Sequence, residues 1–95
     1  MAFSSTGLQP IGGQSKAGNA PQMWSYTTTD AAATVDTSGY FNSVASLLKV
    51  GDLIYRVTTS SGAVSTAGLH IVMTISAAGV VDTSDATALT VTNTD

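Results

Sequence analysis

The residues Gly51-Asp52-Leu53-Ile54-Tyr55-Arg56-Val57 decide the fold, because they hold the clearest strand pattern of the chain. Leu53, Tyr55 and Val57 share one face of an extended backbone, and the two residues between them share the other. The pair Gly51-Asp52 is typical of a turn directly before a strand. This stretch therefore predicts a β-strand over about 53–57.

The same alternation recurs on both sides of this strand. Residues 23–29 alternate aromatic and small polar side chains, and residues 69–75 place four large apolar side chains on one face. The Ser-, Gly- and Ala-rich residues 59–68 between the strands predict a hairpin connection. Shorter strands are expected at 80–81 and 89–92.

One segment has helical rather than alternating spacing. Large side chains at helical intervals predict a short helix over 40–48: Tyr40, Phe41, Val44, Leu47 and Leu48. Residues 31–38 fit a loop, a short strand or a helical turn equally well. The expected fold is mainly β: a small antiparallel barrel or sandwich with one short helix and an extended N-terminal arm.

The N-terminal part differs from the rest in composition. Residues 1–23 scatter Gly and Pro among small polar side chains and follow neither strand nor helix spacing. They predict an extended arm, 1–23, before a compact β module, 24–95. The isolated apolar side chains Phe3, Leu8 and Ile11 suit an arm that lies on another protein. Deleting residues 1–20 is then expected to leave the module folded.

Composition narrows the function classes. Charged residues are only 9% of the chain, the net charge is −3, and the mean hydropathy is +0.25. Disordered chains combine low hydropathy with high net charge, so a folded module in contact with other proteins is favoured. Three basic side chains cannot neutralise a run of phosphates, so no nucleic-acid partner is expected. No apolar run is long enough to span a bilayer, and no signal peptide is recognised. We therefore expect no membrane partner and a soluble protein that stays in the cytoplasm where it is made.

Candidate chemical groups are sparse. The single histidine, His70, lies on the more polar face of its strand and is expected to be half-exposed. Asp82 and Asp85 fit an Asx turn better than a calcium site, and Gly12-Gly13-Gln14-Ser15-Lys16 lacks the residue order of a phosphate-binding loop. We expect no enzyme activity, no catalytic residues, no metal and no cofactor.

The aromatic side chains have two interpretations. Exposed Trp24 and Tyr26 would stack on a sugar, as aromatic residues of β modules often do. With few other large side chains available, we expect five aromatic residues in the module core or a subunit interface instead: Trp24, Tyr26, Tyr40, Phe41 and Tyr55.

Several short motifs carry a resemblance to a known family. Trp24-x-Tyr26, Asp30, Gly39-Tyr40-Phe41 and 50–54 occur in an order that resembles small head-decoration and head-fibre anchor proteins of tailed bacteriophages. The match continues through Gly79-Val80-Val81-Asp82 to the Thr/Val-rich end, and so covers most of residues 24–92.

The resemblance implies a virion structural protein. Such a protein would bind the outside of the phage head as a cement protein, often as a homotrimer, and would bridge subunits of the major capsid protein. Arm residues Phe3, Leu8, Pro10 and Ile11 would then bind the capsid. No fibre domain is expected after Asp95, which favours the cement role. The alternatives are a tail- or fibre-anchoring adaptor and a carbohydrate- or cell-surface-binding β module.

Overall fold

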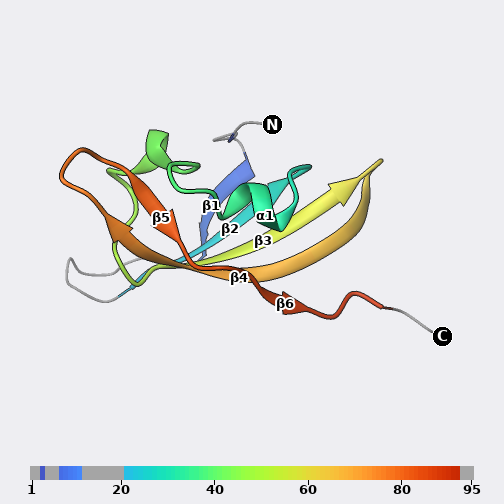
Figure 1. The fold of residues 1–95 in the computed structure, drawn as a ribbon. Coiled ribbons are helices and arrows are strands. Elements are labelled where there is room, and N and C mark those ends of the chain that lie inside the picture. The colour runs from blue at the N-terminus through green and yellow to red at the C-terminus, as the bar shows by residue number, and fades with distance from the viewer. Residues whose placement is uncertain (1–2, 4–6, 12–20, 93–95) are drawn as a thin grey trace.

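The computed structural model describes residues 3, 7–11 and 21–92, and within them the fold is mainly β, as the sequence predicts (Figure 1). Two helical segments occur, α1 (Ala32–Val35) and the 3-10 turn η2 (Asn42–Val44). The strands are β1 (Leu8–Ile11), β2 (Met23–Thr28), β3 (Leu53–Ser60), β4 (Ala63–Ile75), β5 (Val81–Thr83) and β6 (Thr87–Leu89).

The strands form one mixed, open sheet. Its order is β1-β2-β3-β4-β5, and β6 pairs with a separate part of β4. All pairs are antiparallel except β2 and β3, which are parallel. The sheet does not close into a barrel, which was one of the two expected forms, and the expected antiparallel pairing fails at β2 and β3. Parallel neighbours need a long crossover, and residues 29–52 provide it.

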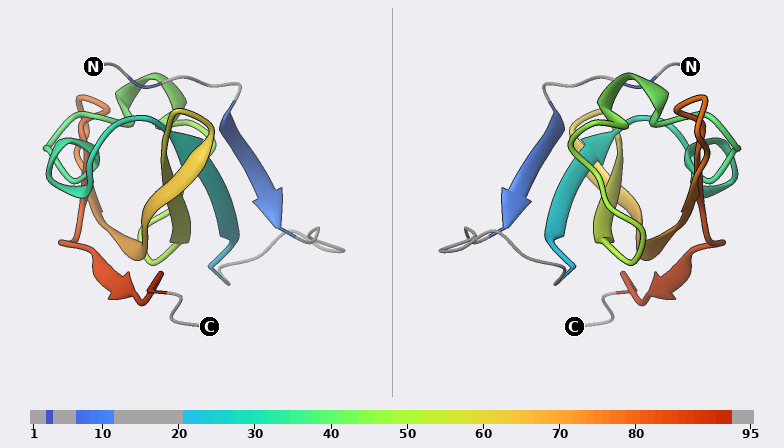
Figure 2. Two further views of the ribbon diagram at one scale, coloured as in Figure 1. Left: turned by 90° about the vertical axis from the view of Figure 1, so that its right-hand side faces the viewer. Right: turned by 90° about the vertical axis from the view of Figure 1, so that its left-hand side faces the viewer.

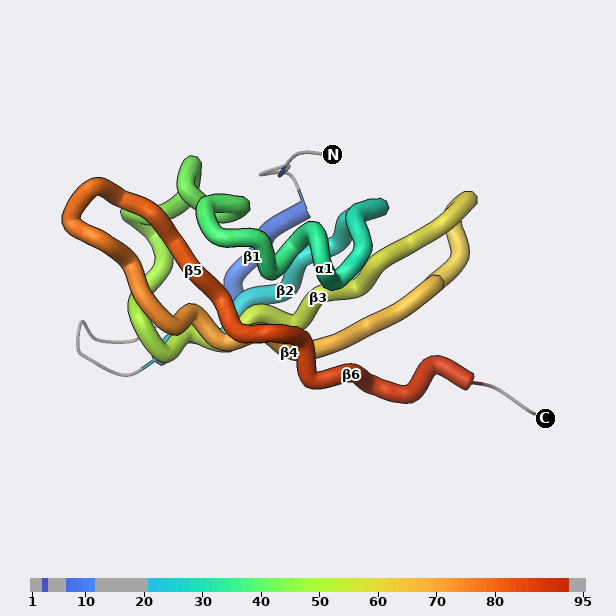
Figure 3. The backbone as a smooth tube through the Cα atoms, in the orientation of Figure 1, coloured from blue at the N-terminus to red at the C-terminus, as the bar shows by residue number. Residues whose placement is uncertain are grey.

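The crossover covers one side of the sheet. Figure 2 shows the sheet curled around residues 29–52, and Figure 3 follows the same path from β2 through α1 to β3. We call this covered side the inner face and the opposite side the outer face. The buried apolar side chains gather between the inner face and the crossover: Leu8, Trp24, Tyr26, Val35, Phe41, Val44, Leu48, Ile54, Val72 and Val81.

The predicted helix over 40–48 is wrong. This segment is a series of tight turns that includes η2. The four-residue helix lies earlier, within residues 31–38, whose sequence fits a loop, a short strand or a helical turn. Most backbone hydrogen bonds of the segment 40–48 join residues three apart, such as Val44 N–H to the Phe41 carbonyl at 3.0 Å. The Asn42 side chain also accepts from the Val81 N–H at 2.9 Å. These contacts with the rest of the fold override the helical spacing.

The hairpin expected within 59–68 is confirmed, but its turn is shorter, because β3 and β4 continue through most of this segment. Ser61 and Gly62, with φ of 52° and 82°, alone make the turn. Two successive positive φ angles are typical of the type I′ turn, whose twist suits a hairpin. The hairpin projects beyond the body at the right of Figure 1.

On β4 the more polar face is buried and the more apolar face is exposed, which is the reverse of the usual arrangement. His70 is completely buried on the inner face, although a half-exposed position was predicted. Ile71 and Met73 point outward and are 45% and 52% exposed. The inner face accepts His70 because Arg56, which lies diagonally across from it on β3 and is paired with Gly68, donates a hydrogen bond to its ring. A buried polar pair thus takes the place of an apolar pair, and the apolar side chains face outward.

Part of the predicted arm belongs to the sheet. Leu8–Ile11 pairs with β2, Leu8 is buried, and the Phe3 ring packs on the core. The remaining residues up to 20 lie outside the described residues, apart from Gly7. Pro10 lies on the edge strand, where its missing N–H hinders the addition of another strand.

Removing residues 1–11 is therefore expected to destabilise the module rather than leave it intact. The loss of Leu8 and Phe3 from the core should lower the free energy of unfolding by about 3 kcal/mol. Urea unfolding of the truncated and full chains, followed by tryptophan fluorescence, measures this difference. Equal midpoints would show that β1 and Phe3 contribute nothing to stability.

Candidate functional site

The outer face of the sheet carries apolar side chains in three adjacent rows. Strand register places Ile11, Met23, Leu53 and Ile71 side by side in one row across β1 to β4. The next row is mixed, with Tyr55 and Leu69 beside the polar residues Gln9, Ser25 and Thr87. The third row contains Thr27, Val57, Ala67 and Leu89. Met73 extends the surface along β4. The three rows come from five different strands, so the sheet itself fixes their relative positions.

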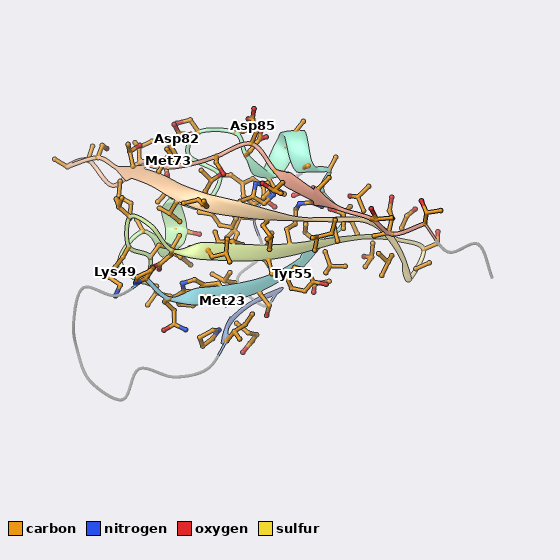
Figure 4. All side chains as sticks on the ribbon, turned by 90° about the horizontal axis from the view of Figure 1, so that it is seen from below. Met23, Lys49, Tyr55, Met73, Asp82 and Asp85 are labelled. Carbon is orange, nitrogen blue, oxygen red and sulfur yellow. The ribbon has the colours of Figure 1, made fainter. Side chains whose placement is uncertain are left out.

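Exposure and charge distinguish this surface. Ile11, Met23 and Leu89 are 40%, 43% and 40% exposed. In Figure 4, Asp82 and Asp85 lie away from Met23 and Tyr55, whereas Lys49 is labelled on the same side as Met23. The residues placed in the rows include no charged side chain. An exposed apolar patch on a folded protein typically marks an interaction site.

The size of the outer face can be derived from sheet geometry. Four strands about 4.8 Å apart and about six residues long, at about 3.3 Å each, cover roughly 400 Å². Functional patches on monomers commonly measure about 300–600 Å², whereas each partner of a standard stable complex buries about 800 Å². One outer face is thus large enough for recognition but small for tight binding.

The inner face contains a buried polar network around Arg56. Its Nη1 donates to the hydroxyls of Thr58 and Thr66, the latter at 3.1 Å, and its Nε donates to His70 Nε2 at 3.0 Å. The Thr58 hydroxyl in turn donates to the Asp30 carbonyl at 2.7 Å. Burial lowers the pKa of Arg56, while the Asp36 carboxylate acts in the opposite direction. Arg56 is 1% exposed, so the network joins β3 to β4 rather than facing solvent.

A second polar group links the crossover to β2. Tyr40 donates to Asp30 Oδ2 at 2.5 Å, and the Tyr40 and Tyr26 hydroxyls lie 2.8 Å apart. Asp30 is 2% exposed, and its other oxygen, Oδ1, has no hydrogen-bond partner among the described residues. Burial, followed by the bond to Asp30, raises the pKa of Tyr40 well above its ordinary value. The Tyr40 hydroxyl therefore stays protonated and acts as a donor.

A third polar group surrounds Asp52, which is completely buried. Its Oδ1 accepts from the Gln22 N–H at 2.9 Å, and its Oδ2 accepts from Trp24 Nε1 and the Lys49 N–H, both at 3.0 Å. This carboxylate joins the beginning of β2, the end of the crossover and the beginning of β3. Gly51, with φ of +96°, permits the turn that places it there.

The predicted aromatic residues divide between the two faces. Trp24, Tyr26 and Phe41 are buried, and Tyr40 packs with them. Tyr26 and Phe41 stack with Phe3 and Tyr40 at centroid distances of 5.0–6.1 Å. Trp24 and Tyr26 therefore offer no open ring face to a sugar. Tyr55 alone among the five lies on the outer face.

The predicted arm residues are also separated. Phe3 and Leu8 contact the core, whereas Pro10 and Ile11 are exposed. Ile11 belongs to the first row of the outer face. Alternation in residues 69–75 predicted one apolar strand face with Leu69, Ile71 and Met73, but not that this face is a surface. The signal for this surface was the alternation of apolar residues along several strands. They lie on the strand face opposite to the one that carries the buried His70 and Arg56.

The described residues offer little for chemistry or metal binding. They bring no three His, Cys, Asp or Glu side chains together in a metal-sized cluster. Asp82 lies within β5 and Asp85 follows it. None of the described helices is long and apolar enough to cross a bilayer. The outer face therefore remains the strongest candidate for a functional site.

Comparisons with protein-family models, curated proteins and solved structures found no match for this chain.

Proposed function

We propose that this protein is a structural component of a tailed-bacteriophage virion, which binds the outside of the head and stabilises it by bridging major capsid subunits. The observation that carries this proposal is the outer face, whose strand rows are largely apolar and carry no charged side chain. Such a surface suits a protein that works while covered by another protein. The resemblance of residues 24–92 to head-decoration proteins is the reason for proposing the phage head as the assembly.

The residues of that resemblance have identifiable roles in the fold. Asp30 and Tyr40 bond to each other, and Asp52 holds Trp24. These side chains fix the crossover and the parallel strand pair, so the resemblance concerns the features that define this fold. A shared fold supports a shared role less directly than a shared site does, and the outer face supplies the surface through which that role would be carried out.

Low charge favours permanent attachment to a shell. Burying Ser, Thr and aliphatic side chains costs less desolvation free energy than burying Lys or Glu. The outer face includes Ser25 beside Tyr55 and Thr27 beside Val57 within its rows. A capsid that presents an equally uncharged surface can therefore cover it without stranding a charge.

The size of the outer face favours binding as an oligomer. One face of roughly 400 Å² is about half of what each partner of a stable complex buries. Linked copies raise the effective concentration of each further contact and so strengthen attachment without new interactions. The homotrimer expected from the resemblance is the form we propose.

Mixing the purified protein with heads of its phage that lack it tests the proposal. We expect saturable binding at symmetry-related sites outside the shell, measured by sedimentation and electron microscopy. Binding at the tail alone would favour the anchoring adaptor. Failure to bind any part of the particle would contradict both structural roles.

A further inference from the structure

The chain after β6 and the β3–β4 hairpin are two parts of the fold that lack a neighbouring strand. We propose that residues 90–92 of one copy pair with the open edge of the β3–β4 hairpin of another copy, so that each subunit donates a strand to the next. This inference rests on the oligomer proposed above and names its interface. Its test needs no phage head, so its failure can be told apart from a failure of head binding.

Residues 90–92 have the composition of a strand but do not form one. Thr90, Val91 and Thr92 continue the sequence of β6, and Thr and Val are among the residues that favour strands. The sequence predicts a strand over 89–92, yet the pairing with β4 ends at Leu89. All three side chains are exposed, Val91 by 45%. This segment is therefore suited to pairing, but it has no partner strand among the described residues.

A β-bulge in β4 explains why the pairing ends there. The register between β3 and β4 shifts after Thr58, which leaves Ser65 without a partner on β3. Continuing the β6 register past Leu89 would set Val91 opposite Ser65. A bulge bends its strand and increases the local twist, and so turns the strand away from a neighbour. Figures 1 and 2 show the hairpin and the chain after β6 diverging.

The hairpin beyond the bulge has two open edges. β2 ends opposite Thr58, and β6 ends opposite Ala67, so no third described strand flanks residues 59–66. Residues 60–66 are all exposed, and the Val64 side chain is 58% exposed. An isolated two-stranded hairpin is only marginally stable in water, so a third strand would stabilise this one.

The two segments carry none of the features that usually prevent strand addition. Edge strands of natural proteins are protected by charged side chains or by proline. Residues 57–69 and 86–92 contain neither, whereas the edge strand β1 contains Pro10. Both segments are therefore open to pairing with another chain.

A second copy of this chain is the partner that satisfies both segments. The bulge separates residues 90–92 from the hairpin of their own chain, and every copy offers one donor strand and one acceptor edge. A different protein on the hairpin would leave residues 90–92 unpaired. Because donor and acceptor are different surfaces, the contact is head-to-tail, and such contacts form a ring when the rotation between copies closes. A ring of three copies is the proposed trimer.

The first experiment removes the N–H groups that the donor strand needs. Successive N–H groups of a strand point to opposite sides, so Val91→Pro/Thr92→Pro removes one that faces the partner in either orientation. By analytical ultracentrifugation we expect the natural protein at about three times the 9.6 kDa of one chain, and the proline variant as a monomer with an unchanged circular dichroism spectrum.

Val91→Ile/Thr92→Val is the matched control. It keeps both N–H groups and two β-branched side chains, so this variant should remain trimeric. A monomeric natural protein, a trimeric proline variant or an equal loss of trimer in the control would overturn the proposal.

The second experiment identifies which chain the donor strand meets. The protein contains no cysteine, so Val64→Cys and Val91→Cys each introduce a single thiol at an exposed position. The two variants are refolded together from urea and treated with a short thiol-specific bifunctional reagent. We expect cross-linked dimers in the mixture and far fewer in either variant alone.

The double variant Val64→Cys/Val91→Cys separates the two possible pairings. Pairing between copies gives cross-linked products of two and three chains, whereas pairing within one chain gives only a cross-linked monomer. Cross-links within one chain alone, or no cross-link in the mixture of the single variants, would overturn the proposal.

Discussion

Replacing Asp52 with alanine is expected to lower the free energy of unfolding by about 3–5 kcal/mol, because a buried carboxylate that accepts three hydrogen bonds is lost. Trp24 Nε1 and two backbone N–H groups would then be buried without partners. Urea unfolding followed by the fluorescence of Trp24, the only tryptophan, measures the loss. A domain of this size has about 5–15 kcal/mol of stability, so the variant should be close to unfolding.

Asp85→Ala is the matched control for this change. Asp85 is exposed in the turn between β5 and β6, so its removal should alter stability by less than about 0.5 kcal/mol at pH 8, where His70 is neutral. If Asp52→Ala were as mild as Asp85→Ala, the carboxylate would not hold β2, β3 and the crossover together.

Replacing Tyr26 with alanine is expected to cost about 4 kcal/mol. Its buried ring stacks on Phe3 at 5.3 Å and meets Phe41 and Tyr40 edge-on, so truncation leaves a cavity at the centre of the core. Thermal unfolding measured by circular dichroism should show a large fall in the midpoint temperature.

Tyr26→Phe separates the ring from its hydroxyl. It keeps the stacking and removes the hydroxyl that lies 2.8 Å from that of Tyr40, so we expect a loss of only about 1 kcal/mol. Similar losses in the phenylalanine and alanine variants would mean that the hydroxyl, rather than ring packing, stabilises the cluster.

Local patterns predicted the strands well because alternation is a property of neighbouring residues. Met23–Thr28 follows the predicted segment closely, β3 begins at the predicted residue and runs on to Ser60, and Tyr26 and Phe41 lie in the core. The parallel pairing of these two strands was not predictable in this way. It depends on where the crossover packs, and Asp52 and Asp30 fix that packing through partners distant in sequence.

The outer face was missed for a related reason. Both faces of β4 carry large side chains, and the usual rule assigns the more apolar face to the core. Arg56 satisfies the His70 ring across β3 and β4, which allows the more polar face to be buried instead. Sequence alone does not reveal that two polar residues fourteen positions apart will pair.

The most direct test of the docking role compares two variants that each place one charge on the surface. Ile71→Asp changes the first row of the outer face, whereas Leu47→Asp changes an exposed residue of the crossover, which covers the inner face. Both side chains are exposed, at 45% and 57%, so both variants should stay folded, and circular dichroism verifies this.

Binding of these variants to undecorated heads, measured by sedimentation, gives the decisive result. We expect Ile71→Asp to bind at least about tenfold more weakly than the natural protein, because docking would bury an unpaired charge, and Leu47→Asp to bind normally. Normal binding by Ile71→Asp, or equal loss in both variants, would contradict a docking role for the outer face.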